Sequence, residues 1–181
     1  ANDVGAMLDF ALKHDEACGI RYPKETAANI ERELQPVTLG KSEVLTDGED
    51  GVIVCFGSLL ENCLQAARRL EEAGLKIGVV NARFAKPIDD ALLKTLIEEK
   101  PFVVTVEEGN LMGGFGTAVL EAANTMGLST ENIHRLGLPD AFVEHGERGE
   151  LLADLGLDVD GIAKRCQKLA ETRVTGTTTE V

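Results

Sequence analysis

The feature that most constrains the fold is an alternation of short apolar runs with longer amphipathic segments between residues 51 and 138. The apolar runs are five to seven residues long, and the first, 51–57, is continuous, which is typical of a strand covered on both faces. Alternating strands and helices of these lengths build βαβ units with right-handed crossovers. The sequence therefore predicts an α/β fold, with an open, mostly parallel sheet and helices on both faces. The expected strands are 51–57, 76–82, 102–106 and 132–138.

Local signals set the ends of the expected helices. Ser58 and Glu61 have the spacing of a capping box, in which each side chain satisfies the other residue's free amide. That helix should end before Gly74, because glycine accepts left-handed backbone. Asp89 or Asp90 should cap the next helix. Further helices are expected at 117–126, around Leu152, and around Ile162 with Asp158 as its cap.

The N-terminal region is less regular. Residues 1–14 carry apolar side chains at helical spacing, and residues 18–23 have the pattern of a short strand that ends at Pro23. Residues 36–50 suggest a hairpin with turns around Gly40 and Gly48. Because the chain starts within a helical pattern and without methionine, we expect it to be part of a longer protein.

Charge and patterning argue against several classes of function. The chain has 18 basic and 31 acidic residues, so its net charge of −13 disfavours nucleic acids and anionic membranes as partners. No apolar stretch reaches the ~18–20 residues of a spanning helix, and the start lacks a secretion-signal pattern. Cysteine and histidine spacings match no zinc motif, so we expect buried thiols and no metal site in this chain. The cysteines are Cys18, Cys55, Cys63 and Cys166.

The glycine-rich stretch "VEEGNLMGGFGTAV" (106–119) raises the question of a phosphate-binding loop. Gly114 and Gly116 match the first two glycines of a dinucleotide fingerprint, but Val119 stands at the third position. The lysine motif of a Walker loop is absent. These departures favour a tight turn that needs glycine for its shape.

Electrostatics point the same way. Glu107 and Glu108 stand at the expected end of a strand, and no Lys or Arg lies between Lys100 and Arg135. Each carboxylate would cost a bound phosphate ~1–4 kcal/mol, whereas a helix N-terminus returns only ~0.3–1 kcal/mol. Two interpretations of Glu107 and Glu108 stay open. They form a solvated pair, or they lie at an interface or active-site rim, where open α/β sheets place ligands.

Four stretches together resemble the C-terminal part of the 1-deoxy-D-xylulose-5-phosphate synthase family, thiamine-diphosphate enzymes of the transketolase superfamily. The match covers nearly all of residues 10–165, and its second and third stretches are also similar to the C-terminal domains of transketolases and 2-oxo-acid dehydrogenase β subunits. The stretches are "RYPK" (21–24), 56–89, 104–119 and 136–162.

The resemblance implies a transketolase C-terminal-domain-like fold and a cytoplasmic, homodimeric transferase. Such an enzyme condenses pyruvate with glyceraldehyde 3-phosphate, releases CO₂, and supplies isoprenoid, thiamine and pyridoxal synthesis. Thiamine diphosphate and Mg²⁺ are held by N-terminal and middle domains, so this chain is expected to bind neither and to be inactive alone. The implied division is the end of the middle domain at 1–24, a linker at 25–40, the C-terminal-like domain at 41–171 and a disordered tail at 172–181.

The resemblance also implies site residues. Lys24 takes the place of the family's second arginine, which helps to bind the substrate phosphate, and Arg21 is the other cation nearby. Glu107, Glu108 and His145 are candidates for an interface or the active-site rim. The resemblance assigns no catalytic, cofactor or metal ligand to this chain. Arg83 and Lys86 are expected to fix their loop or to pair with Glu107 and Glu108.

Two alternatives remain. One is the C-terminal domain of a transketolase or of a 2-oxo-acid dehydrogenase E1 β subunit. The other is a stand-alone flavodoxin-like binding or scaffold module. The sequence that lies upstream of this chain in its gene distinguishes the last from the others.

Overall fold

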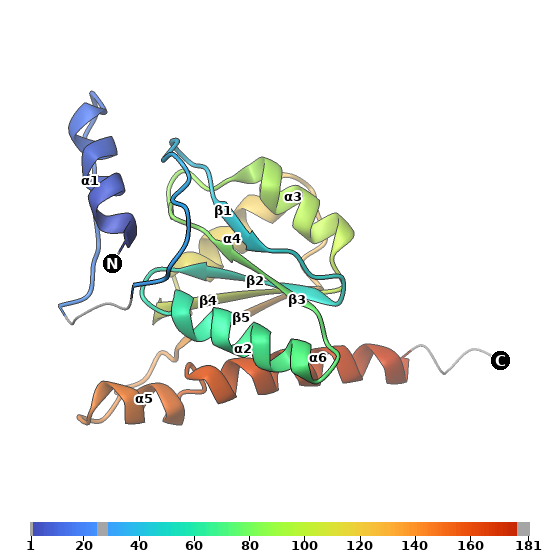
Figure 1. Ribbon diagram of the computed structural model, residues 1–181. Helices are drawn as coiled ribbons and strands as arrows, with labels where there is room; N and C mark the ends of the chain where they lie inside the picture. The colour runs from blue at the N-terminus through green and yellow to red at the C-terminus, as the bar shows by residue number, and fades with distance from the viewer. Residues whose placement is uncertain (1, 25–28, 177–181) are drawn as a thin grey trace.

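The computed structural model describes residues 2–24 and 29–176, and its helices and strands follow the order shown in Figure 1. They are α1 (Asn2–Lys13), β1 (Glu43–Thr46), β2 (Gly51–Phe56), α2 (Leu60–Glu72), β3 (Ile77–Asn81), α3 (Asp90–Glu99), β4 (Val103–Asn110), α4 (Phe115–Thr125), β5 (Ile133–Leu138), α5 (Arg148–Asp154) and α6 (Val159–Gly176).

The strands form one sheet in the order β1-β3-β2-β4-β5. The four strands β3, β2, β4 and β5 run parallel, and β1 joins the edge of β3 in the antiparallel direction. This arrangement confirms the predicted open, mostly parallel sheet. All four expected strands are present, and β4 extends beyond its expected end to include Glu107 through Asn110.

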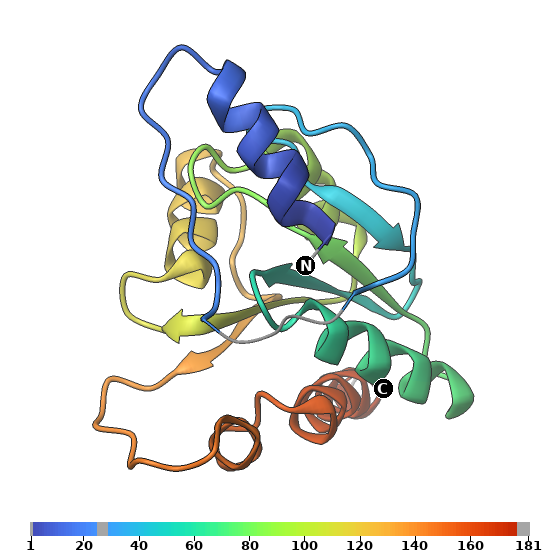
Figure 2. The same cartoon turned by 60° about the vertical axis from the view of Figure 1, so that its left-hand side comes forward.

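Two apolar clusters cover the two faces of the sheet. One joins Ile53, Val104 and Val106 to α2, α5 and α6, and the other joins Val54 and Val103 to α3 and α4. Figures 1 and 2 show α2 and α6 together on one face and α3 and α4 on the other. Burying one large aliphatic side chain contributes roughly 1.5–3 kcal/mol, so these two layers supply the main favourable energy of folding. Helices on both faces are therefore confirmed.

The predicted caps are right at three helix ends and wrong at one. Asp89 accepts a hydrogen bond from the Leu92 amide at 3.4 Å, Asp158 accepts one from the Gly161 amide at 2.8 Å, and Gly74 takes φ +84° after α2. Ser58 does not cap α2, which begins at Leu60 with no side-chain cap. Its hydroxyl donates to the Glu108 carboxylate instead, because β2 and β4 are neighbours and a charged acceptor binds more strongly.

The N-terminal region differs from its expected form. Residues 18–23 are coil rather than a strand, since no strand of the described chain lies beside them to share hydrogen bonds. Residues 36–50 contain one strand, β1, which pairs with β3 rather than folding into a hairpin. Pairing with β3 satisfies backbone groups that would otherwise line an open edge. Of the expected linker, residues 25–28 lie outside the described residues and 29–40 are free of helix and strand.

The end of the chain is more helical than expected. α6 continues through residues 172–176, part of the predicted disordered tail, and the Thr172 hydroxyl donates to the Lys168 carbonyl oxygen within it. Residues 177–181 of that prediction lie outside the described part. Among the described residues, no helix combines the length and apolar character needed to cross a bilayer.

Three of the four cysteines are buried, as predicted, and Cys18 is exposed. Cys55, Cys63 and Cys166 belong to the cluster under α2 and α6, whereas Cys18 lies in the coil after α1, which no sheet face covers. Burial raises the pKa of the Cys63 thiol well above its usual value and that of Cys166 to about 12. Both therefore remain neutral thiols at pH 7.

Candidate functional site

The carboxyl edge of the parallel strands is where an open α/β sheet places its ligands, at the point where strand order reverses. Here α2 leads from β2 to β3 on one side, and α3 carries the chain across to β4 on the other. The reversal point therefore lies between the ends of β2 and β4. Ser58 follows β2, and Glu107 and Glu108 lie in the last part of β4.

Glu107 fills the N-terminus of α4. The residue is 4% exposed. Its carboxylate accepts hydrogen bonds from the Phe115 and Gly116 amides, both at 2.8 Å. Free amides and the helix dipole make such an end attractive to anions. A side chain of the same protein thus occupies the position at the glycine-rich turn where an anion would otherwise bind.

The glycines make room for this carboxylate. A Cβ at Gly114 would collide with the Glu107 carboxylate and the Asn110 carbonyl oxygen, and one at Gly116 would lie 2.6 Å from Thr105 Oγ1. Gly113 adopts φ +72°, a conformation that favours glycine. The turn therefore needs its glycines for close packing and chain reversal, which is the interpretation that the sequence favoured.

Glu108 lies on the opposite face of the sheet, since neighbouring residues of a strand point to opposite sides. Arg148 donates two hydrogen bonds to its carboxylate, from Nε to Oε1 at 3.0 Å and from an Nη to Oε2 at 2.6 Å. The Ser58 hydroxyl donates to the same carboxylate at 2.5 Å. The hydrogen bonds and charge of Arg148, aided by Ser58, lower the pKa of Glu108 despite its partial burial. This cluster ties together the ends of β2 and β4 and the start of α5.

The loop 139–147, between β5 and α5, carries His145 and is exposed. Phe142 is fully exposed and Val143 is partly so, and Met112 from the β4–α4 turn is also exposed. Large apolar side chains in solvent are typical of surfaces that another polypeptide covers. His145 therefore lies in a loop with the properties of a contact surface.

Arg21 and Lys24 lie on the coil after α1, and both are exposed. Within the described residues, no hydrogen bond or ion pair joins either of them to Glu107, Glu108 or His145. Figures 1 and 2 show this coil running toward the end of the molecule where β4 terminates. The five predicted site residues therefore occupy separate segments rather than one compact cluster.

Arg83 does not pair with Glu107 or Glu108, contrary to one of the two expectations for it. It contacts Asp3 at 3.4 Å and Glu43 at 3.2 Å. The strand order explains this, because β2 separates β3 from β4 and Arg83, after β3, faces β1 instead. Lys86 is exposed and forms no ion pair with a described residue.

Sequence reasoning missed the partners of these residues. The spacing of Ser58 and Glu61 predicts a cap rather than a bond to Glu108, and no local signal in "HGERGE" marks Arg148 as the partner of a residue 40 positions earlier. Arg32 was also missed, although it contacts Asp3 at 2.7 Å and Glu43 at 2.9 Å. These contacts depend on which strands are neighbours, a property of the folded sheet.

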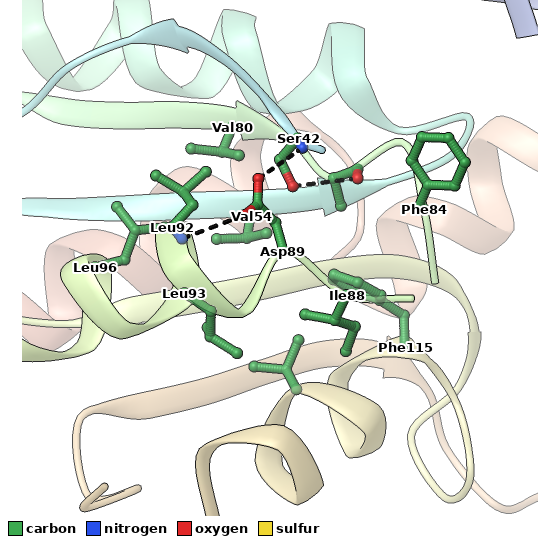
Figure 3. A pocket seen from close by; sticks show the side chains of 12 residues that line it. Ser42, Val54, Val80, Phe84, Ile88, Asp89, Leu92, Leu93, Leu96 and Phe115 are labelled. Carbon is green, nitrogen blue, oxygen red and sulfur yellow. Dashed lines mark hydrogen bonds between the residues drawn. The ribbon is translucent and has the colours of Figure 1, made fainter. Parts of the chain in front are cut away.

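A small, partly open cavity lies between the sheet, α3 and α4 (Figure 3). Its volume is about 20 Å³, and its lining includes the apolar side chains of Val54, Leu93, Leu96 and Phe115. Asp89 and Ser42 stand at its rim, joined by a hydrogen bond of 3.0 Å from the Ser42 amide. A space of this size holds about one water molecule, so it is a packing gap rather than a substrate pocket. No cluster of metal-ligating side chains occurs among the described residues.

Comparison with known proteins places this geometry in a family. Residues 40–162 match a family model described as the C-terminal domain of transketolase. Two curated relatives are a 1-deoxy-D-xylulose-5-phosphate synthase of Rhodopirellula baltica, 46% identical over 94% of this chain, and 1-deoxy-D-xylulose-5-phosphate synthase 1 of Geobacter sulfurreducens, 40% identical over 90%. The chain spans only about a quarter of their length, 27% and 26% respectively.

Solved structures agree on the fold. A split-gene transketolase, described as an inactive β4 tetramer, has a TM-score of 0.71 and 29% identity, covering 80% of this chain and 47% of its own. A transketolase of Pichia stipitis, with a TM-score of 0.52 and 21% identity, covers 75% of this chain and 19% of its own, and shows the fold alone.

Proposed function

The chain belongs to the transketolase C-terminal domain family, and we propose that it is the C-terminal part of a 1-deoxy-D-xylulose-5-phosphate synthase. The observation that carries the proposal is identity of 40–46% to synthases over at least 90% of this chain. The whole enzyme would join a two-carbon unit from pyruvate, after loss of CO₂, to the aldehyde of glyceraldehyde 3-phosphate. Its product would serve isoprenoid, thiamine and pyridoxal synthesis.

Thiamine diphosphate and Mg²⁺ would bind to other domains of that enzyme. When bound, the thiamine cofactor supplies the electron sink for decarboxylation. The residues of this chain do not fit it, because the Glu107 carboxylate already accepts the hydrogen bonds of the α4 amides, and Arg148, the cation at the opposite face of this edge, is paired with Glu108. A diphosphate placed at the start of α4 would find its amides already bonded and would face the Glu107 carboxylate. We therefore infer that the chain is inactive alone.

Arg21 and Lys24 are proposed to contact the phosphate of the aldehyde substrate. Both are exposed and free of ion pairs with described residues, so their charges are available to a ligand. Lysine offers a point charge rather than the planar fork of arginine, so Lys24 should bind phosphate without fixing its orientation. Glu107, Glu108 and His145 are proposed to shape the active-site rim or an interface.

The parent enzyme is proposed to be a cytoplasmic homodimer. The exposed side chains of Phe142, Val143 and Met112 support burial of this edge against another polypeptide. Unpaired cysteines support a reducing compartment. Within the enzyme we assign residues 1–24 to the end of the middle domain, 25–40 to a linker and 41–171 to the C-terminal domain.

The test is an assay of the longer protein with pyruvate and glyceraldehyde 3-phosphate. We expect CO₂ and 1-deoxy-D-xylulose 5-phosphate in equal amounts. Transfer of a two-carbon unit from a ketose phosphate would indicate a transketolase, and acylation of a lipoyl group would indicate a dehydrogenase subunit. Either result would contradict the proposal.

A further inference from the structure

The loop 139–147 is exposed along its whole length, yet both of its ends are attached to the sheet. At its start, the Leu111 amide donates to the Leu138 carbonyl oxygen at 2.8 Å, which joins the end of β5 to the turn after β4. At its far end, Arg148 begins α5 and bonds to Glu108 of β4. The loop therefore connects two fixed points at the carboxyl edge of the sheet.

The far attachment depends on two side chains of α5. This helix is seven residues long, too short to be stable by itself, and its N-cap residue Glu147 makes no side-chain cap bond. Leu152 is buried in the apolar cluster that includes α2 and α6, and Arg148 lies four residues earlier on the same face of the helix. Leu152 therefore holds the body of α5, and Arg148 holds the end that leads into the loop.

The contact made by Arg148 fixes direction as well as distance. Its guanidinium donates to both oxygens of the Glu108 carboxylate, and such charged two-point contacts are the more specific and stronger kind of hydrogen bond. An Nη of Arg148 also donates to the Ser58 hydroxyl at 3.4 Å. Because Glu108 is part of β4 and Ser58 follows β2, the start of α5 is tied to the two central strands.

The loop and the turn beside it display three large apolar side chains. Phe142 and Val143 lie in the loop, and Met112 follows Leu111, whose amide bonds to the last residue of β5. We name Phe142, Val143 and Met112 the edge surface. All three side chains are exposed in this chain, and apolar side chains gain free energy by leaving water, so a surface of this kind marks a contact with another polypeptide.

Two observations indicate which polypeptide covers the edge surface. This chain spans only 26–27% of the length of its relatives, so most of the longer protein lies outside it. Figures 1 and 2 show the coil after α1 at the same end of the molecule as the loop, and Ile20 and Tyr22 of that coil are also exposed. Since α1 and this coil are assigned above to the end of the middle domain, that domain reaches the edge surface.

The same loop of a second copy is a poorer partner. Asp140, Glu144 and Glu147 are exposed on either side of Phe142 and Val143. A two-fold contact between identical loops would bring these acids of both copies together, and like charges oppose association. The middle domain of either subunit in the proposed homodimer is the occupant that avoids this repulsion.

We propose that Arg148 is a positioning residue, which through Glu108 fixes the loop 139–147 and so presents a preformed edge surface to the middle domain. The identity of the occupant rests on the proposed function, whereas the effect of Arg148 on the loop does not. A surface that is already ordered loses less conformational entropy when it binds, so it binds more tightly than a mobile surface with the same side chains.

The first measurement is ¹⁵N relaxation of the Phe142 and Val143 amides in this chain. Order parameters near ~0.85 are typical of rigid backbone, and values below ~0.6 are typical of flexible backbone. We expect about 0.8 for both residues in the unmodified chain and less than about 0.6 in Arg148→Met, with β2 rigid in both proteins. A flexible loop in the unmodified chain, or an equally rigid loop in Arg148→Met, would overturn the proposal.

Arg69→Met is the matched control, because it removes another arginine that pairs with an acid. Arg69 pairs with Asp160 between α2 and α6, but both side chains are mostly exposed, at 57% and 73%. Exposed pairs contribute little, so the loop of Arg69→Met should be as rigid as that of the unmodified chain. Equal loss of loop order in Arg69→Met and Arg148→Met would show that the effect is not specific to Arg148, and would overturn the proposal.

The second measurement is the rate of cleavage by chymotrypsin after Phe142, with the fragments identified by mass. Exposed loops are preferred sites of proteolysis, so this bond should be cut in the isolated chain. We expect cleavage in the longer protein to be at least roughly tenfold slower, and Arg148→Met in the longer protein to restore most of that rate. Equal rates in the unmodified chain and the unmodified longer protein would show that no middle domain covers the edge surface.

Two further results separate the alternatives. If the rate constant for cleavage of this chain alone falls as its concentration rises, a second copy of the loop region covers Phe142, and the proposed occupant is wrong. Neither measurement needs a substrate. A longer protein that makes no deoxyxylulose phosphate would therefore contradict the proposed function, while relaxation and proteolysis would still decide the role of Arg148.

Discussion

Glu107 and Gly116 are joined across the glycine-rich turn, where Oε1 of the carboxylate accepts a hydrogen bond of 2.8 Å from the Gly116 amide. The other oxygen, Oε2, accepts from the Phe115 amide at the same distance. A feature that resembles a phosphate loop in sequence is thus an internal helix cap, formed by a strand residue for the helix that follows it. This relationship explains why acids and glycines occur together at the end of β4.

Replacing Glu107 tests the cap. We expect Glu107→Gln to lower the free energy of unfolding by roughly 1–3 kcal/mol, because the amide group loses the charge and turns a donor toward the α4 amides. Urea unfolding followed by circular dichroism measures the change. Glu121→Gln, on the exposed side of α4, is the control and should stay within about 0.5 kcal/mol of the unmodified chain. Equal effects of the two changes would refute the internal cap.

Gly116→Ala tests whether the glycines serve close packing. Its Cβ would lie 2.6 Å from Thr105 Oγ1 and 2.9 Å from Arg135 Cδ, so we expect a loss of about 1–3 kcal/mol in stability. Gly149→Ala in α5 is the matched change, because no atom lies within 4 Å of the new Cβ. It should be neutral or stabilise by up to about 1 kcal/mol. Thermal unfolding of both variants measures the difference, and a stable Gly116→Ala protein would contradict the packing role.

Thr105 offers a stabilising change. The residue is fully buried on β4, and its Oγ1 has no hydrogen-bond partner. We expect Thr105→Val to raise the free energy of unfolding by about 1 kcal/mol, since a methyl group replaces an unsatisfied hydroxyl of similar size. Thr95→Val, on the exposed surface of α3, should shift it by less than about 0.5 kcal/mol. If Thr105→Val destabilises the protein in urea titrations, the hydroxyl has a partner such as an ordered water.

Acid should release the cluster of Glu108, Arg148 and Ser58. The pKa of Glu108 is lower in the folded protein, so the cluster stabilises the fold above the ordinary glutamate pKa of about 4.3 and loses this contribution as pH falls through the folded value. The side chains are about one-third exposed, so we expect Arg148→Met to cost no more than ~1 kcal/mol at pH 7. The difference between the urea midpoints of Arg148→Met and of the unmodified chain should become smaller below pH ~4. If the difference between the two midpoints stays constant from pH 7 to 3, ionised Glu108 is not the cause of the stability lost in Arg148→Met.

The layers of this fold follow from sequence, and the contacts between strand ends do not. Unbroken apolar runs such as 51–56 and helices at 3.6-residue spacing predict a parallel sheet covered on both faces, as found. The structure shows that β4 extends past Val106. Given that extension, the alternation of side chains along a strand places Glu107 and Glu108 on opposite faces of the sheet. The bond between Ser58 and Glu108 requires that β2 and β4 be neighbours, and the pairing of Arg83 with Glu43 requires that β1 lie beside β3. No local pattern encodes either adjacency.

Calorimetric titration of this chain with thiamine diphosphate and Mg²⁺ at pH 7 tests most directly whether the chain's own carboxylates occupy the groups that could bind an anion. Because Glu107 and Glu108 hold the amide and guanidinium groups at the carboxyl edge, we predict no heat of binding. Saturable binding with a Kd in the micromolar range would contradict this account, because the diphosphate would then bind groups that the account assigns to Glu107 and Glu108.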